Sequence, residues 1–98
     1  MKAISVNNHI AVIVDFTKPE DVFHSSEFTI VGACPESDLI VVGLKDQQNT
    51  DYECFLSAEC LEALAYDDVP RGHLLITKNN VRGDLIDVTE EDLRMFQS

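Results

Sequence analysis

Three cysteines and three histidines are the residues best suited to covalent or metal chemistry: Cys34, Cys54, Cys60, His9, His24 and His73. Nucleophilic catalysis needs a thiolate beside a general base, and a zinc site needs Cys or His ligands spaced about two to four residues apart. No Cys or His pair in the sequence has that spacing, and no local pattern brings a Cys and a His together. We therefore expect buried, reduced cysteines, no bound metal and no cofactor.

Paired carboxylates are the remaining acid–base candidates, because the chain has 18 acidic residues and Asp84 and Asp87 flank a predicted strand. Acidic side chains on a small protein usually serve solvation, and nothing in the sequence places a second catalytic group beside these two. We therefore expect a protein that is not an enzyme.

Charge is the most informative feature of the sequence, with a formal net charge of -11 that is unevenly distributed. Residues 15–68 hold thirteen acidic residues against two lysines, whereas residues 69–83 hold three basic residues and no acidic one. Because phosphate binding requires clustered Lys and Arg, this distribution disfavours nucleic acids and anionic membranes as direct partners. A protein with a basic surface is the expected partner.

The middle segment contains carboxylates that could face such a partner as a row. Acidic residues three positions apart on a helix are separated by a rise of about 4.5 Å, which is comparable to the roughly 3.4 Å of axis per phosphate along one DNA strand. The pattern predicts a small acidic inhibitor or regulator that occupies the basic, nucleic-acid-binding surface of another protein, as DNA mimics and phage-type anti-defence proteins do. The residues predicted to bind the partner are Asp46, Asp51, Glu53, Glu59, Glu62, Asp67 and Asp68.

Other interpretations of the charge stay open. The carboxylates could serve only solubility, or the protein could be a structural or adaptor domain that binds a partner subunit through a sheet edge or an apolar groove. The basic residues Arg71, Lys78 and Arg82 either lie over or beside the carboxylates of the middle segment or meet the acidic patch of a second copy in a homodimer.

Alternating and β-branched residues predict an antiparallel, β-rich α+β fold, with residues 1–98 forming a single domain. Asn7-Asn8 and Asn79-Asn80 are predicted turns, and Gly83 is a predicted bulge. The predicted strands, whose connections are too short for βαβ crossovers, are Ala3–Val6, Ile10–Val14, Glu27–Ala33, Asp38–Leu44, Tyr52–Leu56, His73–Lys78 and Val81–Val88.

Two short helices are predicted after Ser57 and Thr89, because Ser and Thr are favoured N-cap residues. The first should end near Tyr66, and the second should cover Glu90–Gln97. Their expected apolar contacts are Leu61, Leu64 and Ala65 for the first helix and Leu93 and Phe96 for the second. The polar connection between Asp15 and Ser26 should hold one helical turn that ends near Phe23, with a capping box formed by Thr17 and Glu20.

The order of elements from Ala11 to Leu64 is similar to that of an SH3-like barrel. The first strand would be "AVIVDF", the central hairpin "EFTIVGA" with "DLIVVGL", and the last strand with its helical turn "YECFLSAECLEAL". The resemblance covers about half of the chain and implies a small barrel, with a curled sheet as the alternative.

The N-terminal residues have short apolar runs and one lysine, which is unlike a signal peptide, and no apolar stretch is long enough to span a membrane. An odd number of cysteines suits reduced thiols better than a disulfide framework. We therefore expect a cytoplasmic protein.

Overall fold

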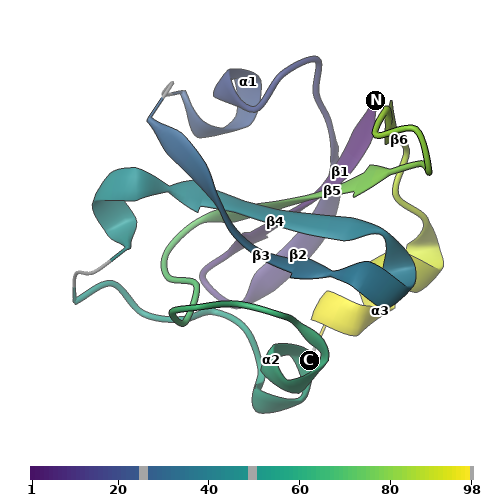
Figure 1. The fold of residues 1–98 in the computed structure, drawn as a ribbon. Helices are drawn as coiled ribbons and strands as arrows, with labels where there is room; N and C mark the ends of the chain where they lie inside the picture. Colours follow the sequence, from purple (N-terminus) through teal and green to yellow (C-terminus); the bar gives the residue numbers. More distant parts are fainter. Residues whose placement is uncertain (25–26, 49–50, 98) are drawn as a thin grey trace.

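The computed structural model contains one antiparallel sheet with the strand order β2-β1-β5-β4-β3, and a short β6 pairs with β5 (Figure 1). The structure describes residues 1–24, 27–48 and 51–97. The strands are β1 Lys2–Asn7, β2 Ile10–Asp15, β3 Phe28–Cys34, β4 Leu39–Leu44, β5 Leu74–Asn79 and β6 Leu85–Ile86. The helices are α1 Glu20–Phe23, α2 Ala58–Ala63 and α3 Glu90–Phe96, with 3-10 turns η1 Pro35–Ser37 and η2 Lys45–Gln47. The prediction of a β-rich α+β fold is confirmed.

Strand β5 lies at the centre of the sheet and joins the hairpin β1-β2 to the hairpin β3-β4. Ile76 is paired with Ile4 of β1 on one side and with Val41 of β4 on the other. Leu74, Leu75 and Ile76 are all fully buried, so both faces of this strand are covered. An uninterrupted apolar run is typical of a strand buried on both faces.

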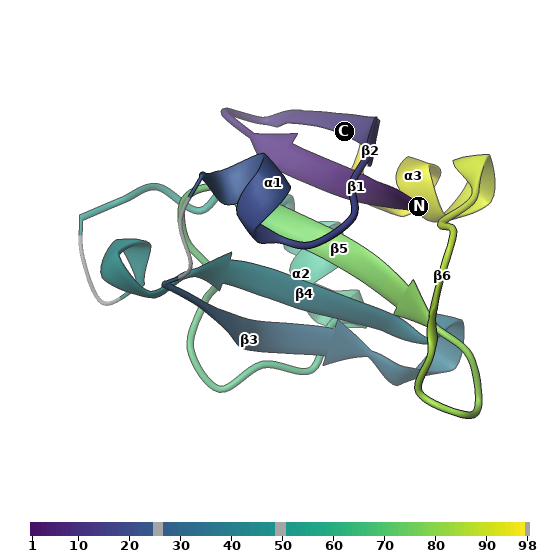
Figure 2. The ribbon, with the colours of Figure 1, turned by 90° about the horizontal axis from the view of Figure 1, so that it is seen from above.

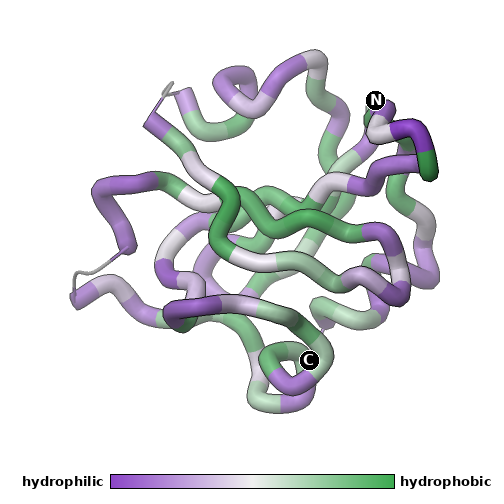
Figure 3. Tube along the Cα trace, viewed as in Figure 1, coloured by the Kyte–Doolittle hydropathy of each residue, from purple (hydrophilic) through white to green (hydrophobic). Residues whose placement is uncertain are grey.

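Each face of the sheet carries its own hydrophobic cluster. In Figure 2, α1 lies in front of β1 and β5, while α2 lies on the opposite side, behind β5 and β4. The cluster under α1 is formed by Ala3, Phe16, Phe23, Val42 and Leu75. The cluster on the opposite face includes Ile4, Val41, Ile76, Cys60 and Leu93. Figure 3 shows the resulting distribution, with apolar residues along the central strands and polar residues in the surrounding loops.

The turn between β1 and β2 is centred on Asn8 and His9, one residue later than predicted. Both residues have positive φ, 54° and 65°, as a tight hairpin turn with the right twist requires. Asparagine adopts this conformation more readily than most residues, which explains why the turn forms beside it.

The connection between β5 and β6 is a loop and not the predicted two-residue turn. The Asn80 side-chain Oδ1 accepts hydrogen bonds from the backbone N–H groups of Arg82 and Asp84, at 2.9 and 3.0 Å. Gly83 lies in this loop with φ 85°, so it forms no bulge in a strand. The second arm is consequently reduced to the two residues of β6. The sheet has its bulge in β3, between Ile30 and Gly32.

The predicted strand Tyr52–Leu56 is wrong. This segment is irregular. Leu56 belongs to the hydrophobic cluster that contains Cys60, and Cys54 and Phe55 pack against that cluster. The place beside β4 is taken by β5, so the resemblance to an SH3-like barrel fails at its last strand. Because β2 and β3 stand at the two ends of the strand order, the sheet is open and does not close into the small barrel that the resemblance implied.

The N-caps of both predicted helices are confirmed, but α2 is shorter than expected. The Ser57 Oγ accepts a hydrogen bond from the Cys60 N–H at 3.2 Å, and α2 ends at Ala63, before the predicted end near Tyr66. Cys60 and Leu64 are buried, whereas Ala65 is exposed and pairs with Ala33 of β3. Because Ala65 is paired with a strand, the helix cannot continue to Tyr66.

The helical turn near Phe23 forms as predicted, but its cap differs. The N-cap of α1 is Pro19, and no side chain caps the helix, so the predicted capping box of Thr17 and Glu20 is wrong. The carboxylate of Asp21 instead accepts hydrogen bonds from the backbone N–H groups of Thr17 and Lys18, which precede the helix, both at 3.1 Å. The last two residues of the predicted connection, 25 and 26, lie outside the described residues, as do residues 49 and 50 of the polar loop after β4.

Candidate functional site

The three cysteines lie in or against one hydrophobic cluster and are free thiols. Cys34 and Cys60 are buried, and Cys54 is half-buried. Burial raises the pKa of the Cys60 thiol to about 11, and repulsion from Cys54 and Cys34 acts in the same direction. A thiol that stays protonated near neutral pH is a poor nucleophile and a poor metal ligand.

We expect iodoacetamide at about pH 7.5 to alkylate Cys54 first and Cys60 last in the folded protein, because alkylation requires an accessible thiolate. Mass spectrometry of peptides taken over time measures the order, and the same reaction in guanidinium should label all three cysteines. Labelling of Cys60 as fast as Cys54 in the native protein would contradict the assignment of Cys60 to the core.

Among residues 1–24, 27–48 and 51–97, no group of three or more His, Cys, Asp or Glu side chains is arranged to hold a metal ion. No helix in the same part of the chain is both long and apolar enough to cross a membrane.

A serine–histidine pair is present that the sequence did not indicate. Ser5 Oγ of β1 and His73 Nε2 lie 2.7 Å apart, and the His73 ring packs edge-on against Phe23 with ring centroids 5.0 Å apart. Ser5 is only 9% exposed, and burial lowers the pKa of His73, so the ring is neutral at pH 7. The two residues are separated by 68 positions, so no local pattern could reveal them. A covered hydroxyl cannot reach a substrate, and we assign the pair a structural role beneath α1.

The seven carboxylates predicted to bind a partner are all exposed. Asp67 and Asp68 lie together on the wall of a groove beside β3. Glu59 of α2 borders a smaller groove beside Arg94, and Glu53 Oε1 lies 3.2 Å from His9 Nε2. In Figures 1 and 2, η2, which carries Asp46, lies well away from α2. The seven residues thus spread over several elements.

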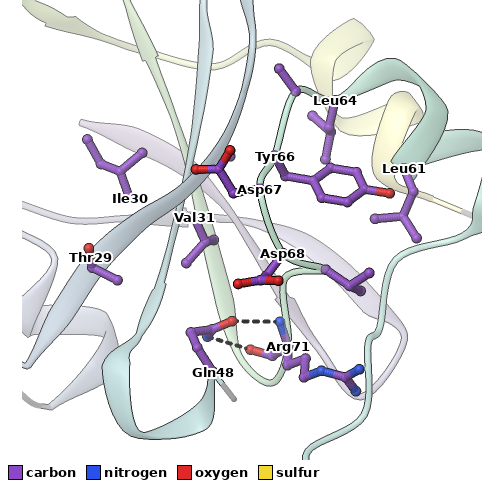
Figure 4. A pocket seen from close by; sticks show the side chains of 13 residues that line it. Thr29, Ile30, Val31, Gln48, Leu61, Leu64, Tyr66, Asp67, Asp68 and Arg71 are labelled. Carbon is purple, nitrogen blue, oxygen red and sulfur yellow. Dashed lines mark hydrogen bonds between the residues drawn. The ribbon is translucent and has the colours of Figure 1, made fainter. Parts of the chain in front are cut away.

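The groove that contains Asp67 and Asp68 has a volume of about 1120 Å³ and runs along the edge strand β3. One wall is Thr29–Gly32 of β3, and the other is the segment 64–69 that follows α2. Ile30 is 66% exposed there, and Tyr66 is also exposed. Figure 4 shows the carboxylates of Asp67 and Asp68 on the side of this segment that faces Val31. The groove therefore combines apolar and acidic surfaces.

The end of the groove is held in place by two neighbouring glutamines. Gln48 donates from Nε2 to the backbone oxygens of Leu44 and Arg71 and accepts at Oε1 from the Arg71 N–H, each at 2.9 Å. Figure 4 shows the two bonds with Arg71. Gln47 Oε1 accepts from the His73 N–H at 2.9 Å. These bonds fix the chain that leads from the groove into β5.

Of the three basic residues, Arg71 borders the groove together with Asp67 and Asp68, beside carboxylates of the middle segment, whereas Lys78 is paired with an acidic residue outside that segment. Lys78 Nζ lies 3.0 Å from a carboxylate oxygen of Asp92 in α3, and Arg71 Nη1 donates to the backbone oxygen of Tyr52 at 3.0 Å. Arg82 lies in the loop after β5, where its backbone N–H is bound by Asn80. The Lys78 and Arg71 side chains therefore make contacts at separate points of the fold.

The Asp92 carboxylate is 9% exposed and takes part in the capping box of α3. Burial by itself would raise the pKa of Asp92, but the hydrogen bonds from Thr89 and Lys78, together with the Lys78 charge, outweigh burial and lower it.

Comparison with family models, with curated proteins and with solved structures found no match to this chain.

Proposed function

We propose that this protein is a small, non-enzymatic cytoplasmic inhibitor or regulator that occupies the basic, nucleic-acid-binding surface of another protein. The observation that carries the proposal is the exposure of all seven predicted carboxylates on a chain of net charge -11. Within the described part of the chain, Glu53 is the one member of the seven whose carboxylate is hydrogen-bonded to another side chain, that of His9. The other six carboxylates are available to a partner.

Binding would act by occlusion and by electrostatic complementarity. Glu59 and Glu62 are exposed on α2, where three residues of helix correspond to about 4.5 Å of rise. Asp67 and Asp68 follow the helix and extend the negative surface to the groove. Complementary charge accelerates association and makes affinity fall with salt.

Reversing Glu59, Glu62, Asp67 and Asp68 to lysine should lower affinity for a basic nucleic-acid-binding protein by about a hundredfold or more, because it replaces attraction with repulsion at the contact. The partner is obtained by capture from a lysate of the source cells, elution with a salt gradient and competition with duplex DNA. Release at roughly 0.5 M salt and displacement by DNA are expected.

The matched control reverses four exposed carboxylates on other elements, Asp15, Glu36, Asp84 and Glu91, and changes the net charge equally. This control should retain most of the affinity. Equal losses in both variants would mean that only net charge matters. Retention of the partner by the first variant would refute the proposed binding surface.

An adaptor domain is the second candidate, favoured by the groove along β3 and the exposed Ile30. An adaptor that relies on apolar contacts would hold a neutral partner subunit at high salt. The salt gradient therefore separates the two functions, because only the acidic regulator loses its partner in it.

A further inference from the structure

The outer edge of β3 is covered at one end, where the segment that follows α2 pairs with it. Ala33 exchanges both backbone hydrogen bonds with Ala65, at 2.9 and 2.7 Å, and this is the one bridge outside the named strands in the described residues. Before the bridge, Thr29–Gly32 borders the groove. An edge strand of this kind presents backbone donors and acceptors to a further strand.

The bridge also explains the shape of the groove. A Cβ on Gly32 would lie 3.2 Å from the Ala65 backbone oxygen and 3.5 Å from the Tyr66 Cβ, so the absence of a side chain permits this close approach. Beyond Ala65, the chain carries Asp67 and Asp68 along the opposite wall. The bridge thus fixes one end of a slot whose edge strand spans about 13 Å over four residues.

We propose that this groove binds an extended segment of the basic partner as a short added strand beside β3, with a Lys or Arg side chain of that segment in contact with Asp67 and Asp68. This inference rests on the proposed function. The groove supplies the two components of such recognition, backbone pairing at a sheet edge and side-chain pockets that select the sequence. Ile30 and Leu61 offer apolar contacts to side chains that alternate with the basic ones. The bulge between Ile30 and Gly32 limits the paired length, so side-chain contacts contribute much of the affinity.

Charge decides between a basic segment and a second copy of this chain. Two chains of net charge -11 repel each other, and the groove walls add Asp67 and Asp68 to the contact. Arg71 also borders the groove, but its Nη1 is bound to the Tyr52 backbone oxygen. A basic peptide gains from the same field that opposes self-association.

The test is selection of a displayed library of random ten-residue linear peptides against the folded protein, followed by amide chemical-shift mapping with the enriched peptides. We expect sequences in which Lys or Arg alternates with apolar residues, and shifts concentrated in Thr29–Gly32 and in residues 65–68. Ile30→Lys should weaken these peptides at least about tenfold, because it adds a repelling charge at the edge.

Val12→Lys is the matched control, since Val12 is an exposed apolar residue, 46% accessible, on the other edge strand β2. It should leave the peptide affinity nearly unchanged. Acidic or unselected sequences, or shifts confined to other elements, would overturn the proposal, and so would dimerisation abolished by Ile30→Lys without peptide binding.

The two proposals fail differently. If a DNA-displaceable partner is lost with the reversed carboxylates but kept by Ile30→Lys, the regulator function stands and strand addition is wrong. If basic peptides bind at β3 while no captured protein is displaced by DNA, the groove site stands and nucleic-acid mimicry is wrong.

Discussion

Replacing Asp92 with alanine should lower the free energy of unfolding by about 2–4 kcal/mol, because it removes a buried ion pair and a helix cap together. The carboxylate lies 3.0 and 3.3 Å from Lys78 Nζ and accepts the Thr89 N–H at 2.8 Å. The lower end of the range applies if Lys78, whose side chain is 22% exposed, turns into solvent. Chemical denaturation of both proteins measures the difference.

Glu91→Ala is the control, since Glu91 is an exposed residue in the same turn of α3. Its expected cost is about 0.5 kcal/mol, the typical value of an exposed charge near a helix N-terminus. A similar small loss for Asp92→Ala would show that the pair with Lys78 contributes little to stability.

The effect of Asp92 should depend on pH in a defined direction. Because the pKa of Asp92 is lowered in the folded protein, its stabilising contribution is fully present above the ordinary value of 3.8. That contribution is lost as the pH falls through the folded value. The stability difference between the native protein and Asp92→Asn should therefore be constant near neutral pH and shrink in strong acid.

Gly72→Ala should lower the free energy of unfolding by about 2–3 kcal/mol, the second large effect. Gly72 has φ 73°, and an added Cβ would clash with the side-chain Oε1 of Gln47. A non-glycine residue in the left-handed region costs about 1–2 kcal/mol. Gln47 must then move away from the His73 N–H, which costs about another 1 kcal/mol for the lost hydrogen bond.

Gly83→Ala separates the two contributions, because Gly83 also has a positive φ, 85°, but no atom lies within 4 Å of its added Cβ. It should cost only the backbone contribution, about 1–2 kcal/mol. Denaturation curves of the two variants measure the difference directly. Equal losses would show that Gln47 adapts without cost.

Local signals in the sequence predicted most elements of the fold but not their partners. The caps Ser57 and Thr89 act within three residues of sequence. The apolar runs of β3, β4 and β5 can likewise be recognised as strands from their composition, without knowledge of their neighbours. Tyr52–Leu56 has the same β-forming composition, yet β5 occupies the position beside β4. The preference of that segment was overridden by tertiary packing.

The candidate site was predictable only in part. Charge composition identified Asp67 and Asp68 as exposed acidic residues, because charged side chains are rarely buried. The groove beside them depends on the contact between Ala65 and Ala33, which no local pattern specifies. The pair Lys78 and Asp92 is likewise formed by packing α3 against the sheet, so an electrostatic count along the sequence could not assign it.

The central position of β5 has a consequence for how the chain acquires its structure. Each hairpin, β1-β2 and β3-β4, is closed by neighbouring residues and can form early, but both need β5 as their second neighbour. On the ribosome, the N-terminal hairpin must wait until residues up to Asn79 have emerged before it can join the sheet. Pairing across such a separation slows folding, and we expect the insertion of β5 between the two hairpins to be a late step.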